Sequence, residues 1–234
     1  MEFTPRKNNP KETYERILNV SAQLFSEKGF TKTTMQDIID RSGLSKGAIF
    51  YHFKSKEDIY HAVTQKMDES AIKRVYSWLA EVEHLPVKER IEQLLFRSLT
   101  DAENTAVVEQ IARVSIYDTH LALVDMQNNV KKSAPLLAEL IKEGITDGSI
   151  TTEYPDEAAE LLVLLINYWC EPYIFQPSEL SAVYKRYKVL QLIMRQLGLD
   201  VITDEIIEVA YEFTEKLYNK IVTEKLFNGE SNHD

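Results

Sequence analysis

The chain has 234 residues, a formal net charge of −10 and a single cysteine, which excludes an internal disulfide. Its hydrophobic content of 44% and charged content of 27% are those of an ordinary folded protein and exclude a disordered chain. The longest apolar run, Leu161 to Ile166, is far shorter than the roughly 20 residues that cross a bilayer, and the N-terminus has no signal-peptide pattern. We therefore expect a cytoplasmic protein with no membrane partner.

The negative charge is distributed unevenly along the chain. Residues 1–56 contain ten Lys and Arg against six Asp and Glu, whereas the remainder contains 17 against 31. The total charge argues against nucleic acid, because duplex DNA repels an acidic surface. The asymmetry instead favours a basic working end on an acidic body, although an ordinary solvated surface has the same composition.

The first two predicted helices lie before Gly43. Apolar residues at i, i+3 and i+4 spacing over residues 14–25 predict a helix that ends at Gly29. Thr33 followed by Gln36 has the pattern of a capping box, so a second helix of about two turns is expected to start there. Gly43 is expected to stop it.

A third helix is predicted over residues 45–53, with Ser45 as its N-cap. Two short helices joined by the sequence SGL have the spacing of a helix-turn-helix. A second capping box, Ser55 to Asp58, is expected to start a fourth helix that continues to about Val82, a rod of roughly 40 Å.

The rest of the chain also has helical periodicity, and we find no convincing alternating strand, so the predicted fold class is all-α. Gly144 and Gly148 are expected to end one helix and Gly198 another, while Thr203 starts the last one and Pro172 kinks or breaks its helix. The predicted helices of this part lie at about 87–103, 105–118, 119–131, 135–147, 156–175, 179–197 and 204–226.

The third helix has two different faces when it is wound at 100° per residue. Ile49 and Phe53 fall together and are expected to pack inward. The outward face combines aromatic and basic groups, with a glycine that lets another surface approach closely. An ordinary core with a solvated rim explains any one of these residues, but their joint occurrence favours contact with phosphates and base edges. The outward residues are Lys46, Gly47, Phe50 and Tyr51.

The segment TTMQDIIDRSGLSKGAIFYHFKSKEDIY resembles the DNA-binding segment of the TetR family of bacterial transcriptional regulators. The resemblance spans roughly residues 13–63. It implies a homodimer whose two N-terminal heads occupy successive major grooves of a partly palindromic double-stranded DNA operator, with residues 45–51 as the recognition helix. The implied organisation is a flexible tail at 1–10, a helix-turn-helix domain at 11–56, a helical ligand-binding and dimerisation domain at 57–228 and a tail at 229–234.

The resemblance also implies roles for individual residues of the N-terminal domain. Thr33 or Thr34 would bond a phosphate at the start of the second helix, and Lys56 would hold a phosphate at the start of the fourth. His52 would lie near the DNA backbone. Phe50 stands where the family often has Tyr, so its role shifts from hydrogen bonding to packing or to contact with a thymine methyl group. The full set of expected DNA-binding residues is Thr33, Thr34, Ser45, Lys46, Gly47, Phe50, Tyr51, His52 and Lys56.

In the C-terminal part, the helices near 156–175 and 179–197 are apolar over wide arcs, which is explained by a central core or by a core face plus a dimer face. Helix 204–226 could replace one of them in the dimer. Glu171 would favour a cationic ligand, although an exposed salt bridge is the simpler interpretation. Cys170 is expected to be inert packing rather than an oxidant sensor. The resemblance places a small-molecule effector pocket between the fourth helix and its neighbours, with Trp78, Phe96, Tyr117, Leu121, Met126, Trp169 and Tyr173 as candidate lining residues.

Motifs of the common enzyme classes are missing from the sequence: there is no HExxH, GxSxG, P-loop or Gly-rich dinucleotide turn. The five histidines are scattered, so we expect no metal, no cofactor and no catalytic site. The predicted function is a transcriptional regulator, most simply a repressor, released from its operator by a small, largely apolar ligand. The alternative is a helical protein-interaction or scaffold protein, which would show no salt-sensitive retention of duplex DNA.

Overall fold

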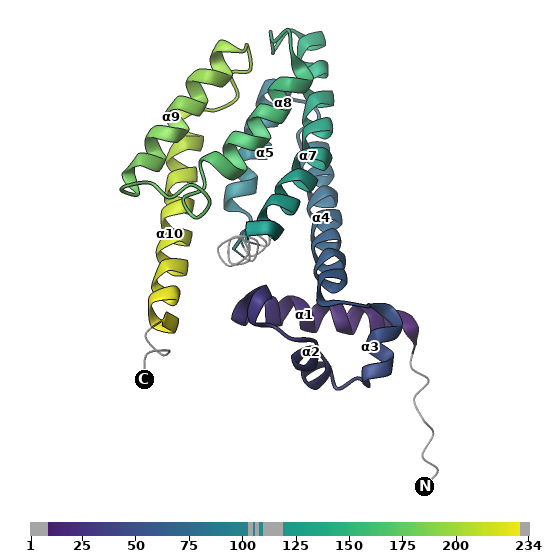
Figure 1. Cartoon of the computed structure of the whole chain (residues 1–234). Coiled ribbons are helices and arrows are strands. Elements are labelled where there is room, and N and C mark those ends of the chain that lie inside the picture. The colour runs from purple at the N-terminus through teal and green to yellow at the C-terminus, as the bar shows by residue number, and fades with distance from the viewer. Residues whose placement is uncertain (1–8, 103–104, 106–107, 110–118, 230–234) are drawn as a thin grey trace. The chain divides into compact units, whose positions relative to one another are not determined.

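The structure, a computed structural model, describes residues 9–102, 105, 108–109 and 119–229. Every regular element in these ranges is a helix (Figure 1), which confirms the all-α prediction. The predicted helix 105–118 lies almost entirely outside the described residues, as do the two tails. The helices are α1 Pro10–Lys32, α2 Met35–Ser42, α3 Lys46–His52, α4 Lys56–Glu81, α5 Val87–Thr100, α7 Thr119–Asp147, α8 Pro155–Leu164, the π-helical turn η1 Leu165–Trp169, α9 Ser181–Gln196 and α10 Asp204–Gly229.

The chain divides into two compact units, residues 1–73 and 74–234. The division falls within α4, whereas the expected domain boundary at residue 56 lies at the start of that helix. The physical reason for the difference is that Ile59, Tyr60 and Val63, all on the first part of α4, are buried. The rings of Phe25 and Phe30 from α1 lie 5.8 and 5.2 Å from the Tyr60 ring, so this part of α4 completes the first core.

The first unit packs α1 against α2 and α3. The inward residues of the sequence pattern are buried, including Ile17 and Phe25 of α1, Ile38 of α2 and Ile49 of α3. The predicted end of the first helix is also found, since Gly29 has non-helical φ/ψ of 81° and 160°. One further turn follows it, so α1 extends to Lys32.

The predicted start of α2 is wrong by one residue. The N-cap is Thr34, whose hydroxyl accepts a hydrogen bond from the Asp37 N–H (3.1 Å), and the Asp37 carboxylate accepts one from the Thr34 N–H (2.7 Å). The capping box is therefore Thr34–Asp37, not Thr33–Gln36. Thr33 is buried, and its hydroxyl donates to the Gly29 carbonyl (2.7 Å), so it ends α1 instead of starting α2.

In the second unit, α7 joins two helices that the sequence pattern separates. Pro135 lies inside α7, and the helix continues through it because Ala134, Ala138 and Ile141 are buried in the core that α7 shares with α8. Gly144 does not end this helix either. A side chain there would meet the Ile150 Cδ1 at 2.5 Å, so this glycine allows a close approach, and Gly148 with φ of +79° follows the last helical residue.

The predicted helix 156–175 ends earlier than expected. After Leu164 the chain makes a π-helical turn in which the Cys170 N–H donates to the Leu165 carbonyl (2.9 Å), and Pro172 follows in a turn. The last two helices agree with the prediction, and Thr203 starts α10 by accepting a hydrogen bond from the Ile206 N–H (3.2 Å).

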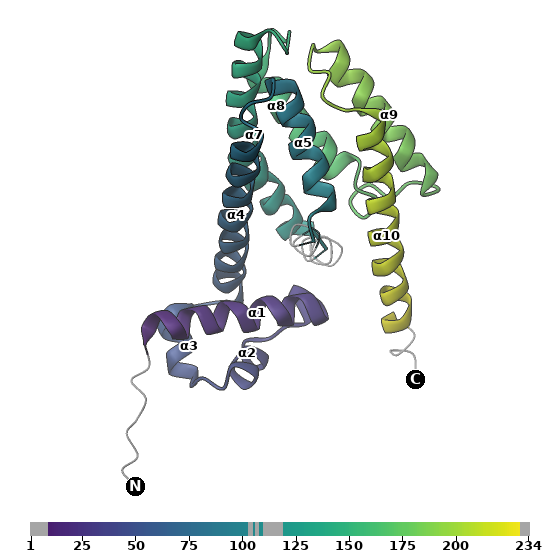
Figure 2. The same cartoon turned by 180° about the vertical axis from the view of Figure 1, so that it is seen from behind.

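The second unit places α5 between α7 and α10, and α10 against α9 (Figure 2). Its core combines Ile91 of α5, Ile141 of α7, Leu162 of α8, Leu190 of α9 and Ile207 of α10. No described helix is long and apolar enough to cross a membrane.

Candidate nucleic-acid interface

The turn between α2 and α3 is held by backbone and side-chain capping. Gly43 adopts the left-handed conformation (φ 64°, ψ 20°) that a glycine allows, and its N–H donates to the Ile39 carbonyl (3.0 Å). Ser45 caps α3 as predicted, accepting a hydrogen bond from the Ala48 N–H (3.2 Å). This tight connection fixes the direction of α3 relative to α2.

The two faces of α3 point as the sequence pattern predicts. Ile49 is fully buried and Phe53 is 5% exposed, whereas Tyr51 is 76% exposed. Lys46 is exposed, with its ammonium 5.7 Å from the Phe50 ring, and Phe50 itself is half-buried. A side chain at Gly47 would meet no atom within 4 Å, so this position is open to an approaching surface.

His52 is held in place by aromatic neighbours. Its ring lies 5.0 Å from the Tyr51 ring and 5.8 Å from the Tyr14 ring of α1, while Tyr14 also stacks on Phe53 at 5.2 Å. These ring contacts link the exposed end of α3 to α1. The exposed Tyr51 ring therefore projects from a supported helix end.

The two threonines at the start of α2 differ in what they can contact. Thr33 is 1% exposed and its hydroxyl donates inward, so the structure does not support it as a phosphate ligand. Thr34 is exposed, and its hydroxyl lies at the helix N-terminus beside Asp37. The predicted phosphate contact stays a prediction for Thr34.

The Lys56 ammonium is bonded within the first unit, and the phosphate contact that the family resemblance implies stays a prediction. Its ammonium donates to the carbonyls of Phe30 (2.7 Å) and Thr33 (2.8 Å), with Thr31 at 3.4 Å, and lies 4.2 Å from the Phe30 ring centroid. Phe30 and Thr31 belong to the last turn of α1 and Thr33 is its C-cap, so these carbonyls lie where the helix ends. The side chain thus caps α1 from the start of α4, because an ammonium has three donors and the carbonyls occupy them. The prediction that it holds a phosphate is not supported by this geometry.

The start of α4 is the predicted capping box. The Asp58 carboxylate accepts from the N–H groups of Lys54 (2.9 Å) and Ser55 (3.0 Å), and the Asp58 N–H donates to the Ser55 hydroxyl (3.0 Å). Lys54 donates its ammonium to the Phe50 carbonyl (3.0 Å), at the end of α3. An acid therefore already occupies part of this helix N-terminus, which weakens it as an anion site.

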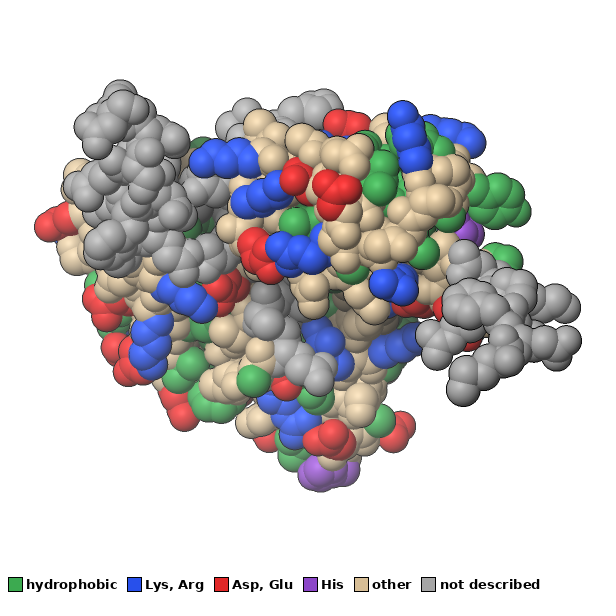
Figure 3. Space-filling model, turned by 90° about the horizontal axis from the view of Figure 1, so that it is seen from below, with side chains coloured by type: hydrophobic (Ala, Val, Ile, Leu, Met, Phe, Trp, Pro, Cys, Tyr) green, Lys and Arg blue, Asp and Glu red, His purple; other side chains and the backbone are tan. Residues whose placement is uncertain are grey.

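Ion pairs connect α1 to α2. Arg41 binds Glu27 through two hydrogen bonds of 3.1 and 2.9 Å, and Lys28 pairs with Asp37 at 2.6 Å. The Lys28 ammonium, with hydrogen bonds from Thr34, holds the pKa of Asp37 well below its usual value. Figure 3 shows Lys and Arg side chains intermixed with acidic and apolar ones on the side of the molecule seen from below. An exposed basic side chain on α3 is therefore better evidence for a DNA contact than the number of basic residues in the first unit.

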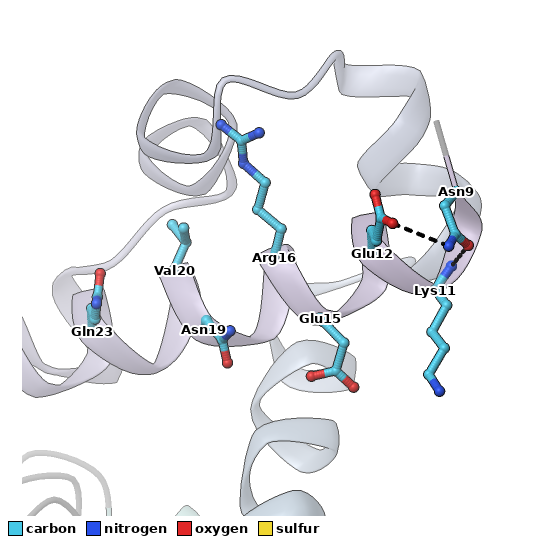
Figure 4. A pocket seen from close by; sticks show the side chains of 8 residues that line it. All are labelled: Asn9, Lys11, Glu12, Glu15, Arg16, Asn19, Val20 and Gln23. Carbon is cyan, nitrogen blue, oxygen red and sulfur yellow. Dashed lines mark hydrogen bonds between the residues drawn. The ribbon is translucent and has the colours of Figure 1, made fainter. Parts of the chain in front are cut away.

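A shallow depression on α1 (Figure 4) does not add to this interface. Glu15 and Arg16 point to opposite sides of the helix. The Lys66 ammonium of α4 bonds to Glu15 and to Asn19 (3.2 Å), and Asn9 caps α1 by accepting from the Lys11 N–H (3.1 Å). Glu15, Asn19 and Asn9 of this depression are therefore used in stabilising the first unit.

The candidate effector residues fall on several elements of the second unit. Trp78 of α4, Phe96 of α5 and Met126 of α7 are half-buried, and Trp169 packs against the main core. Tyr173 packs on a separate small cluster around Leu217 and Ile221. Tyr117 and the side chain of Leu121 lie outside the described residues.

The exposed salt bridge expected for Glu171 is not found with any described residue, and the Oε2 of this acid is buried. Burial raises the pKa of this carboxyl to about 7, and the nearby Tyr173 hydroxyl opposes the rise although neither atom forms a hydrogen bond of normal geometry. Pro172 in the sequence predicts a break in the helix near this acid, but sequence alone does not give the direction of the Glu171 side chain.

Cys170 is buried, as expected of a packing cysteine. Burial raises the pKa of its thiol to about 12, and the Glu171 carboxylate acts in the same direction. A protonated, enclosed thiol is a poor nucleophile and a poor oxidant sensor. Within the described ranges, no group of three or more His, Cys, Asp or Glu is placed to hold a metal ion.

The comparisons with known proteins agree with this geometry. Residues 17–63 match the model for bacterial regulatory proteins, tetR family. The HTH-type transcriptional repressor KstR2 of Mycolicibacterium smegmatis is 26% identical over 167 residues, which are 68% of this chain and 77% of that protein. The uncharacterized HTH-type transcriptional regulator YerO of Bacillus subtilis is 54% identical over 46 residues, 20% of this chain and 16% of its own.

A solved structure extends the similarity in fold to most of the chain. The putative TetR-family transcriptional regulator from Syntrophomonas wolfei superposes with a TM-score of 0.59 at 22% identity, covering 89% of this chain and 96% of that one. Sequence identity is high only over a short N-terminal stretch and is low over the rest of the chain. The helical fold of the second unit is therefore shared with proteins whose sequences differ there.

Proposed function

Because the chain belongs to the TetR family of bacterial transcriptional regulators, a family of non-enzymatic DNA-binding proteins, we propose that it represses transcription as a homodimer on a partly palindromic operator. Release from the operator follows binding of a small, largely apolar ligand in the second unit. The observation that carries the proposal is the exposed face of α3, where Tyr51 is 76% exposed beside an open Gly47.

In this proposal α3 enters the major groove as the recognition helix. Tyr51 donates or accepts a hydrogen bond at a base edge or phosphate, and Lys46 supplies a positive charge at the start of the helix. Gly47 lets the DNA approach the backbone. Phe50 is half-buried and cannot form a hydrogen bond, so it contacts a thymine methyl group or supports Tyr51.

Contacts to the DNA backbone fix the orientation of the head. Thr34 and Ser45 are both exposed at helix N-termini. The Ser45 hydroxyl accepts from the Ala48 N–H and can donate its proton to a phosphate, whereas the hydroxyl and N–H of Thr34 already donate to the Asp37 carboxylate, which a phosphate would have to replace. His52 is half-buried and is positioned by Tyr14, so it borders the interface rather than entering the groove. Contacts of this kind carry affinity and salt dependence but little sequence information.

The proposed dimer uses the apolar surface of the second unit. Val189 is 42% exposed and Leu192 is 55% exposed, and their spacing of three residues places them on one face of α9. A two-fold axis would bring this face against its copy, because the same patch serves both subunits. The two heads would then be about 34–36 Å apart, one turn of DNA.

Ligand control needs two states of the dimer that differ in head spacing. α4 is one continuous helix that contributes to both compact units, so a ligand bound beside its second part can favour one state of the head. The shift can be no larger than the difference in the ligand's affinity for the two states. The candidate residues Trp78, Phe96, Met126 and Trp169 provide the apolar surface.

The test is selection of operator DNA from a random library, followed by fluorescence anisotropy with Tyr51→Ala. We expect the variant to lose most of its preference for the selected sequence, since a good base contact contributes about 1–3 kcal/mol of discrimination. Tyr76→Ala removes a tyrosine that is 56% exposed on α4 and serves as the matched control. Undiminished discrimination by the Tyr51 variant would exclude direct reading by this residue. Absence of any salt-sensitive DNA retention would favour the scaffold alternative.

A further inference from the structure

A buried acidic group, Glu171, lies in the second unit beside the hydroxyl of Tyr173. The Oε2 of Glu171 and the Tyr173 hydroxyl are both buried, and no other described residue hydrogen-bonds to either of them. The phenol lowers the pKa of the acid as a hydrogen-bonding neighbour, but it carries no positive charge, so the buried carboxylate still needs an explanation.

The surroundings of this acid are aromatic and apolar. Tyr173 packs with Phe213 against the buried Leu217 and Ile221 of α10. On the other side, Tyr187 of α9 is buried, and its hydroxyl lies 2.8 Å from that of Thr214. Burial raises the pKa of both Tyr173 and Tyr187, and the Glu171 carboxylate acts in the same direction on each.

Arg186 of α9 is bonded to backbone carbonyls near Glu171 in the chain. The Arg186 guanidinium donates to the carbonyls of Trp169 (3.0 Å) and Phe175 (2.7 Å), on either side of Glu171 in the chain. Among the described residues, Cys170 and the two tyrosines are titratable groups whose pKa the Glu171 carboxylate affects, and none of them is a cation. Within the same described residues, no Lys or Arg charge is among the causes of the shift in the Glu171 pKa.

The backbone around the acid is fixed rather than adaptable. The π-helical turn closes on the Leu165 carbonyl, and the Glu171 carbonyl accepts from the N–H groups of Ile174 (3.2 Å) and Phe175 (3.1 Å). Together with Arg186 these bonds hold residues 169–175 in one arrangement. π-helical turns are frequent at functional sites, because they offset the residues that follow them.

An ionised carboxylate that is buried without a partner is strongly destabilising, so it must be protonated or meet a positive charge. We propose that Glu171 is the anchor for an organic cation, an amine, ammonium or phosphonium compound with an apolar or aromatic body. The carboxylate pairs with the cation, and the rings of Tyr173 and Tyr187 supply apolar and cation–π contact. The inference rests on the proposed function, since this ligand would be the effector.

The chemistry favours an organic cation over a metal ion. Hard metal ions take six or more oxygen ligands and transition metals take several nitrogen or sulfur ligands, whereas this site offers one carboxylate and phenol hydroxyls. The nearby aromatic and aliphatic side chains suit a ligand whose charge is surrounded by carbon.

The experiment is isothermal titration calorimetry of the full chain at pH 8 with two organic cations, tetraphenylphosphonium and benzyltrimethylammonium. Tetraphenylborate, which has the shape of tetraphenylphosphonium and the opposite charge, is the ligand control. We expect at least one cation to bind, and Glu171→Gln to weaken that binding by about tenfold or more. Glu160→Gln, which neutralises an exposed acid on α8, is the matched control and should leave binding unchanged.

A second measurement uses the wild-type chain alone. Near pH 7 about half of the Glu171 carboxyls are protonated, so cation binding should release up to about half a proton. The release is measured from the dependence of the binding enthalpy on the ionisation enthalpy of the buffer. Proton release by the wild type supports the site even if the Gln variant folds poorly.

Three results would overturn the inference: no binding of either cation, equal affinity of wild type and Glu171→Gln, or equal binding of tetraphenylborate. Anisotropy of selected operator DNA separates the two proposals. A chain that binds DNA but no cation refutes only the cation site, whereas a chain that binds a cation but no DNA refutes the proposed regulator.

Discussion

The cap that Lys56 places on α1 can be tested with Lys56→Met, which keeps most of the aliphatic stem and removes the ammonium. Two short hydrogen bonds, to the Phe30 carbonyl at 2.7 Å and to the Thr33 carbonyl at 2.8 Å, are lost together with the contact to the Phe30 ring. Hydrogen bonds from a charged group contribute roughly 1.5–3 kcal/mol each in buried sites, and an exposed cation–π contact about 0.5 kcal/mol.

Because Lys56 is half-exposed, water replaces part of what is lost, and we expect a decrease of about 2 kcal/mol in the free energy of unfolding. For a chain of this length that lowers the melting temperature by roughly 4–8 °C. Circular dichroism melts measure the loss of stability, and anisotropy of operator DNA at several salt concentrations measures the number of phosphate contacts.

The same two measurements distinguish a cap from a phosphate ligand. A capping lysine loses stability on substitution while the slope of log affinity against log salt stays unchanged. Lys46→Met, an exposed residue on α3, should do the opposite: unchanged stability and a slope smaller by about 0.9. If Lys56→Met melts with the wild type and lowers the salt slope by about one, the interpretation as a cap is refuted.

Gly47 on α3 and the buried Glu171 can each be tested by a single substitution. Gly47→Ala should raise the free energy of unfolding by up to about 0.5 kcal/mol, because a Cβ there meets no atom within 4 Å. The same variant should weaken operator binding about tenfold, because the added methyl group holds the DNA away from α3. Chemical denaturation measures the first effect and anisotropy the second, and an unchanged affinity would contradict the close approach of DNA to Gly47. Burial raises the pKa of Glu171 from 4.5 to about 7, so the folded chain holds this proton more tightly than the unfolded chain. The free energy of unfolding should therefore fall by about 3 kcal/mol as the pH rises from about 4.5 to 7, and it should level off above that. Glu171→Gln should remove this decrease, as urea unfolding at pH 5 and pH 8 would show; an equal difference between variant and wild type at the two pH values would argue against a buried acid.

The parts of the structure that the sequence predicted well are those with local causes. Ser45 and the Ser55–Asp58 box start their helices where the pattern places them, because a cap needs only a hydroxyl or carboxylate within three residues of an N–H group. The inward direction of Ile49 follows from helical periodicity. The error at the start of α2 was also local, since both Thr33 and Thr34 can cap and only their tertiary surroundings separate them.

The errors elsewhere have long-range causes. α7 passes through Pro135 because Ala134 and Ala138 are buried against α8, a contact that no local rule contains. The early end of α8 in a π-helical turn likewise depends on packing and on Arg186 of α9.

By itself the sequence determined the helix-turn-helix, the two faces of α3 and the all-helical class, because periodicity and caps act over a few residues. Only the tertiary structure decided the roles of two charged side chains. Lys56 meets carbonyls some 25 residues earlier in the chain, and the Oε2 of Glu171 is buried in the second unit. The sequence identifies a charged side chain but not the direction in which it points. Tertiary packing decides whether that side chain faces solvent, caps a helix or is buried where it can bind a ligand of opposite charge.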